Sequence, residues 1–102
     1  SWTARVRDLV RRQLLDIAEL NDVATALQVH PQTLRRRLAA EGTTFKDIKN
    51  QVRRDTALHF LGKQGLSIEE ISHRAGFSES SAFIRAFKSW TGVTPYTYRK
   101  GL

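Results

Sequence analysis

Residues 67–99 read SIEEISHRAGFSESSAFIRAFKSWTGVTPYTYR, and they show how the chain is built. Apolar side chains recur in them every three or four positions, which is the period of an amphipathic helix. Ser67–Glu70 has the pattern of a helix-starting capping box, while Gly76 and Gly92 are typical of helix ends. Thr94–Pro95 can begin one more short helix. These residues therefore predict two helices joined by a tight turn and followed by a third.

A similar pattern lies about 48 to 50 residues earlier in the chain. There Arg36 matches Arg85 and Gly42 matches Gly92. Chance similarity between two amphipathic hairpins is the alternative, but apolar spacing alone does not explain matched glycine and arginine positions. Two helices joined by a three- or four-residue turn form a helix-turn-helix, so the repeat indicates two such units.

We therefore expect an all-α, homeodomain-like fold of seven helices that forms one domain over residues 1–102. Its parts are two helix-turn-helix units at about 20–42 and 67–92, a linker helix at about 44–63 and a final short helix at 94–100. The first helix is expected at Thr3–Leu15, with its apolar stripe continuing to Ile17. The second is expected to have Asn21 as its N-cap and to end near Gln28, and the third to start at Pro31.

The net charge indicates a polyanionic partner. The chain has 102 residues, 17 Lys and Arg against 10 Asp and Glu, and a formal charge of +7. The excess is spread over both halves, with nine basic and six acidic residues in 1–51 and eight and four in 52–102. A basic globular domain most often meets nucleic acid, although net charge that only keeps the protein soluble is the alternative.

Helix three carries the side chains that read bases in the major groove. With Leu34 and Leu38 facing inward, its outward residues are Gln32, Thr33, Arg35 and Arg36. Arginine pairs with guanine O6 and N7, and glutamine with adenine N6 and N7. We expect Arg35 and Arg36 to carry most base discrimination, and a solvated basic face without specific contacts is the alternative.

The matching helix of the second unit offers a poorer face. With Phe83 and Phe87 inward, the outward candidates for base reading are Ser80, Ser81, Ile84 and Arg85, of which Arg85 is the main anchor. Phosphate contacts are expected from residues at the starts and flanks of these two helices. These are His30, Pro31, Arg37, Ser78 and Lys88.

Other classes of function have little support. Cysteine is absent, and neither a nucleophile elbow nor a phosphate-cradling glycine loop occurs. The single Glu70-x-x-His73 pair lacks the second pair that a di-iron bundle needs. No apolar run is long enough to span a membrane, and aromatic residues at helical spacing are core more often than stacking platforms. We expect no enzyme activity and no cofactor or metal.

Three segments at characteristic spacing carry a family resemblance. They are Ala75-Gly-Phe77, Phe83-x-Arg-x-Phe-Lys88 and Gly92-x-Thr-Pro-x-x-Tyr-Arg99. Together with Leu20–Gly42 they resemble the DNA-binding domain of the AraC/XylS family of bacterial transcription regulators, over nearly the whole chain. The resemblance implies a rigid linker helix and two recognition helices in successive major grooves of one DNA face. It also implies base contacts from Gln32, Arg35, Arg36, Ser80, Ser81 and Arg85.

The resemblance has further implications. Ser72, Leu38 and His30 stand where the family more usually has alanine, phenylalanine and a capping serine. Such domains usually follow an N-terminal effector or dimerisation domain, so the chain is expected to be a fragment without its signal-sensing half. Activity as a transcription activator in the bacterial cytoplasm, at the nucleoid, is implied, with RNA polymerase as a partner. A protein-interaction module, in which one unit contacts RNA polymerase in place of DNA, is the alternative.

Overall fold

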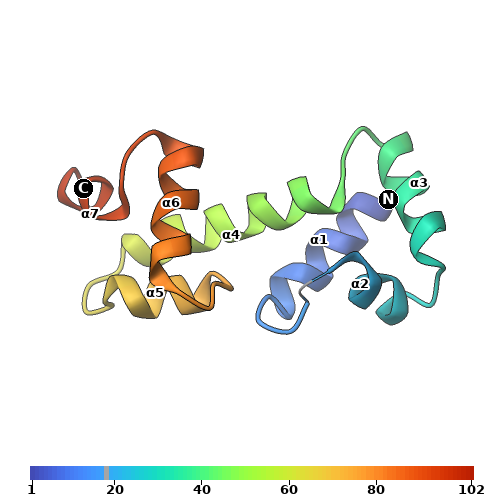
Figure 1. The fold of residues 1–102 in the computed structure, drawn as a ribbon, viewed down its shortest axis with the longest axis horizontal. Coiled ribbons are helices and arrows are strands. Elements are labelled where there is room, and N and C mark those ends of the chain that lie inside the picture. Colours follow the sequence, from blue (N-terminus) through green and yellow to red (C-terminus); the bar gives the residue numbers. More distant parts are fainter. Residues whose placement is uncertain (18) are drawn as a thin grey trace. The chain divides into compact units, whose positions relative to one another are not determined.

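A computed structural model describes residues 1–17 and 19–102, and within these residues every regular element is a helix. In chain order the helices are α1 (Trp2–Arg12), α2 (Leu20–Ala26), α3 (Pro31–Ala40), α4 (Phe45–Leu61), α5 (Ile68–Arg74), α6 (Ser80–Thr91) and α7 (Pro95–Lys100) (Figure 1). The predicted all-α fold with seven helices is therefore confirmed. None of these helices is long and apolar enough to cross a membrane.

The helices fall into two compact units, Ser1–Val52 and Arg53–Leu102. The first unit packs α1, α2, α3 and the start of α4 around one apolar core, in which Val6, Val10 and Leu34 are completely buried. The second packs the rest of α4 with α5 and α6 around another core, in which Phe83 and Phe87 are completely buried. Each unit therefore buries its own apolar face, and α4 contributes residues to both cores.

Several helix boundaries differ from the predicted ones. α1 ends at Arg12, because Gln13 leaves the helical conformation with φ −128°; the chain then turns, and Leu14 and Ile17 still reach the core. α2 begins at Leu20 with Glu19 as its N-cap. The prediction of Asn21 as that cap was wrong, because the carboxylate of Asp22 accepts the Glu19 N–H at 3.0 Å and so starts the helix earlier.

The end of α2 also differs from its prediction. The helix ends at Ala26, and Gln28 lies in the turn with a left-handed φ of 58°. The N–H of Val29 donates to the carbonyl of Ala24 at 3.0 Å, which turns the chain toward α3. α3 then begins at Pro31, as predicted. Proline suits this position, because the first amide of a helix has no partner within the helix.

The second unit follows its predicted signals more closely. Ser67 caps α5 by accepting the Glu70 N–H at 3.1 Å, and Thr94 caps α7 by accepting the Thr97 N–H at 3.2 Å. α6 ends at Thr91, and its C-cap Gly92 closes the helix with a left-handed φ of 85°. In both units the longer helix therefore follows a short helix and a tight turn (Figure 1).

Candidate nucleic-acid interface

α3 has one buried and one exposed face. Leu34 and Leu38 are completely or almost completely buried in the first core. Gln32, Arg35 and Arg36 are exposed, whereas Thr33 is half-buried. The structure therefore brings three of the predicted base-reading side chains to the accessible side of one helix.

Two of these exposed side chains contact each other. Nη1 of Arg35 donates a hydrogen bond to Oε1 of Gln32 at 2.6 Å. The residues are three positions apart, which is the spacing of neighbours on a helix surface. A charged donor shortens and strengthens such a bond. The bond therefore orients the guanidinium of Arg35 toward Gln32 on the exposed face.

His30 caps α3. Its Nδ1 accepts the backbone N–H of Gln32 at 3.1 Å. The imidazole therefore caps the helix N-terminus, a role that serine commonly has. An Nδ1 that accepts leaves the proton of the neutral ring on Nε2. The His30 side chain is exposed, and Pro31 is half-buried at the first helical position. Both predicted phosphate contacts thus lie at the accessible start of α3.

Arg37 lies near the start of α1, beside the ring of Trp2. Its guanidinium is 5.9 Å from the centre of that ring, and the guanidinium of Arg5 is 4.5 Å from it. Trp2 itself is partly buried against the first core. Arg37 therefore has a structural contact in addition to its predicted role at a phosphate.

Glu41, directly after α3, holds the start of α1. Its carboxylate accepts the backbone N–H groups of Trp2 at 3.0 Å and Thr3 at 2.9 Å, and the Thr3 hydroxyl at 2.5 Å. The bond from the Thr3 hydroxyl, followed by those from the Thr3 and Trp2 amides, lowers the pKa of Glu41 to about 2. This clamp joins the end of α3 to α1, and the sequence analysis missed it.

α6 presents a less polar face. Ser81 and Arg85 are exposed, Ser80 is half-buried, and Ile84 is half-buried against the second core. The predicted phosphate residues Ser78 and Lys88 are exposed. At the start of α6 a groove of about 450 Å³ is lined by Glu69, Ser72, His73, Phe77, Ser78, Glu79, Ser80 and Ser81. Two carboxylates therefore lie beside the predicted base-reading serines.

Arg53 of α4 holds the turn between α5 and α6. One of its Nη atoms donates to the carbonyl of Gly76 at 3.2 Å, and its guanidinium lies 4.4 Å from the centre of the Phe77 ring. Burial lowers the pKa of Arg53. Sequence reasoning missed this residue, although a hint was available: Arg53 lies four positions before Ala57, on the flank of the apolar stripe of α4.

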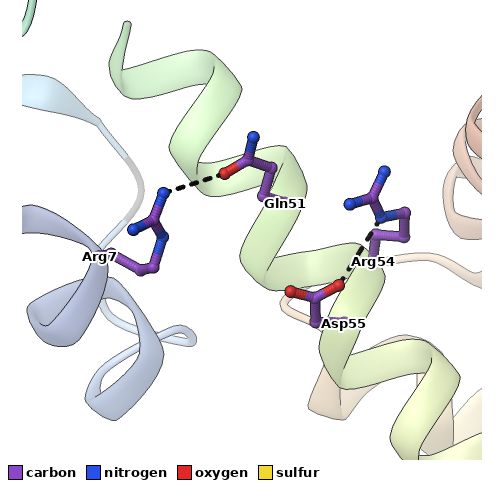
Figure 2. Close-up of polar contacts among 4 residues, drawn as sticks. All are labelled: Arg7, Gln51, Arg54 and Asp55. Atoms are coloured by element: carbon purple, nitrogen blue, oxygen red, sulfur yellow. Dashed lines mark hydrogen bonds and ion pairs between the residues drawn. The ribbon is translucent and has the colours of Figure 1, made fainter. Parts of the chain in front are cut away.

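Other arginines have local partners (Figure 2). Arg7 of α1 donates to Oε1 of Gln51 on α4 at 3.2 Å, within the first unit. Nε of Arg54 lies 3.7 Å from Oδ1 of its neighbour Asp55. Groups of three or more histidine or acidic side chains that could hold a metal do not occur among residues 1–17 and 19–102.

Comparisons with known proteins place these features in context. A family model described as a helix-turn-helix domain matches residues 23–101. An HTH-type transcriptional regulator of Mycobacterium bovis is 42% identical over 98 residues, which are 96% of this chain. The chain spans only 28% of that relative's length.

Solved structures of transcriptional regulators have a similar fold. The regulator CdpR from Pseudomonas aeruginosa matches 98% of this chain and 32% of its own, with a TM-score of 0.89 and 36% identity. The DNA-binding domain of AdpA, a global transcriptional factor solved in complex with a target DNA, matches 97% of this chain and 90% of its own. Its TM-score is 0.83, and its identity of 21% supports a likeness of fold.

Proposed function

Because the chain belongs to the AraC-type helix-turn-helix family of transcriptional regulators, we propose that it binds duplex DNA sequence-specifically as the DNA-binding part of such a regulator. The family consists of transcriptional regulators and not of enzymes. Likeness to the fold of a domain that was solved on its target DNA supports the proposal.

The exposed face of α3 is the observation that carries this function. A recognition helix needs one face for the core and another for base edges. Leu34 and Leu38 supply the first, and Arg35 and Arg36 supply the second. In this proposal the two arginines discriminate bases, with contributions from Gln32 and Thr33. His30, Pro31 and Arg37 contact phosphates near the same helix.

We assign the second recognition helix to α6, which enters the successive major groove in the same proposal. Arg85 is its main base contact, with smaller contributions from Ser80, Ser81 and Ile84. Ser78 and Lys88 contact phosphates. The exposed face of α6 has one arginine that is proposed to read a base, Arg85, whereas the exposed face of α3 has two. We therefore expect weaker sequence discrimination in the second half of the site than in the first.

A protein contact by the second unit is the other candidate function. The groove at the start of α6 includes Glu69 and Glu79, whose carboxylates oppose a phosphate backbone. In that case α6 contacts RNA polymerase while α3 holds the DNA. We also propose that the full-length protein adds an N-terminal effector or dimerisation domain and acts in the bacterial cytoplasm, at the nucleoid.

Selection of binding sites from a random duplex library tests the DNA-binding proposal. The purified chain is expected to enrich two blocks of sequence about one helical turn apart, roughly 10 bp, the first more restrictive than the second. A single block would favour the protein contact by α6. Absence of any enriched sequence, with affinity that falls steeply as salt rises, would contradict sequence-specific binding and leave only phosphate attraction.

A further inference from the structure

The contact between Gln32 and Arg35 restricts what the first recognition helix can read. Reading adenine requires glutamine to accept from N6 with its amide oxygen while it donates to N7 with its amide nitrogen. In Gln32 that oxygen already accepts from Arg35 at 2.6 Å. This distance is shorter than the usual range for N–H···O bonds, which is about 2.7–3.2 Å. The acceptor that adenine needs is therefore engaged within the protein.

The groups left over on this pair are hydrogen-bond donors. A guanidinium has five N–H donors and no acceptor, and the amide nitrogen of glutamine adds two more. With the oxygen of Gln32 turned toward Arg35, the exposed pair presents N–H groups to a ligand. In the major groove, guanine has two neighbouring acceptors, N7 and O6, whereas adenine has one acceptor beside an N–H donor. A surface of donors therefore complements guanine and opposes adenine.

We propose that Gln32 and Arg35 act as one guanine-selecting unit. Arg35 donates to O6 and N7 of guanine, and Gln32 is a positioning residue that holds the guanidinium in the orientation for this contact. The inference rests on the proposed function, because it names the base that the α3 surface selects. An orientation fixed before binding lowers the entropy cost of the contact.

The two recognition helices differ at these positions. In the internal repeat Ser81 matches Gln32 and Ile84 matches Arg35. Ile84 is half-buried against the second core. The α6 side therefore has no arginine–glutamine pair at these positions. We expect this guanine selection in the block read by α3 and not in the block read by α6.

Arg36 provides a matched control on the same helix. It is exposed, and it has no hydrogen bond or ion pair with any residue in the described part of the chain. Its contact with DNA is expected to be independent of Gln32. Replacing Arg36 with alanine therefore leaves the base chosen by Arg35 unchanged, although total affinity falls.

The test is selection from a random duplex library with the chain, the Arg36→Ala control and four variants of the Gln32–Arg35 pair. The unchanged chain is expected to enrich guanine at one position of the first block. Gln32→Ala lowers that preference roughly tenfold, because the guanidinium loses its support. Gln32→Glu keeps the preference, because a carboxylate also accepts from Arg35, although its charge lowers affinity for all DNA.

Arg35→Ala gives the sharpest prediction. It frees the oxygen of Gln32, so the preferred base at this position or the next changes from guanine to adenine. The double variant Arg35→Ala/Gln32→Ala loses that adenine preference. Equal helicity and melting temperature across the series would show that the fold is unchanged.

Two outcomes would overturn the paired role and leave DNA reading intact. One outcome is a preference for adenine in the unchanged chain that Gln32→Ala removes. It would show that Gln32 reads a base directly. The other is a guanine preference that Gln32→Ala does not change. If the unchanged chain enriches no sequence, the proposed function fails, and this inference fails with it.

Discussion

Gln28 and Gly76 occupy the same position in the two turns, and both have left-handed backbone conformations, with φ of 58° and 89°. The residue after each donates its N–H to a carbonyl five positions earlier, Val29 to Ala24 and Phe77 to Ser72, both at 3.0 Å. The two units therefore use the same turn. In the turn of the first unit, Gln28, which has a side chain, adopts a backbone conformation that favours glycine.

Gln28→Gly is expected to stabilise the first unit by about 1 kcal/mol, because glycine adopts this φ without the steric cost of a Cβ atom. Urea unfolding of both proteins measures the change. Gly76→Ala is the reciprocal variant and is expected to destabilise the second unit by a similar amount. Equal unfolding free energies for Gln28→Gly and the unchanged chain would show that the Gln28 conformation costs nothing.

The Glu41 clamp predicts acid sensitivity. The pKa of Glu41 is about 2 in the folded chain against an ordinary value of 4.5, because Thr3 and Trp2 donate to its carboxylate. A lowered pKa contributes stability that is present above about pH 4.5 and is lost as the pH falls toward 2. Glu41→Gln is expected to lower stability at pH 7 and to flatten its decline between pH 4.5 and 2. Melting temperatures across this range test the prediction, and parallel curves for the two proteins would contradict it.

Arg53 is expected to stabilise the turn before α6. Arg53→Ala removes the hydrogen bond to the Gly76 carbonyl and the contact with the Phe77 ring, at an expected cost of about 1–2 kcal/mol. Arg54→Ala is the matched control, because Arg54 forms a long ion pair of 3.7 Å with its exposed neighbour Asp55 and the expected cost is within about 0.5 kcal/mol. Denaturant unfolding measures both. Equal costs would show that the Arg53 contacts add nothing.

Arg85→Ala separates the two proposed roles of α6. If Arg85 reads a base, affinity for a selected duplex falls by about 1–3 kcal/mol and discrimination in the second block is lost. Fluorescence anisotropy with matched duplexes measures this loss. Unchanged DNA affinity combined with loss of promoter activation by the full-length protein would favour a contact with RNA polymerase.

The helices and their buried faces could be predicted because local patterns determine them. The spacing of Leu34 and Leu38 predicts the inward face of α3, and Pro31 predicts its start, as the structure confirms. The N-cap of α2 was missed because Asn21 is a residue type preferred at N-caps, whereas Glu19, which takes the position, is not. The carboxylate of Asp22 at the third helical position accepts the Glu19 N–H and so fixes the earlier start.

The contacts that hold the proposed recognition helices were harder to predict. Glu41 binds Thr3 across 38 positions, and Arg53 binds Gly76 across 23. No periodic pattern in the sequence indicates either pair, because the geometry of each pair depends on how the helices pack. The hydrogen bond between Gln32 and Arg35 joins residues that are close in sequence. Whether it forms depends on the rotamers of both side chains, and residue spacing alone does not specify these rotamers.

The most direct test of the central claim, that α3 reads bases, compares two duplexes of equal length at one salt concentration. One carries the selected site and the other a random sequence. Arg35→Ala and Arg36→Ala are expected each to weaken binding to the selected duplex by about 1–3 kcal/mol and to the random duplex much less. Lys88→Ala, as a proposed phosphate contact, is expected to weaken both equally. If the two α3 variants also lose affinity equally for both duplexes, Arg35 and Arg36 contact phosphates and the claim is wrong.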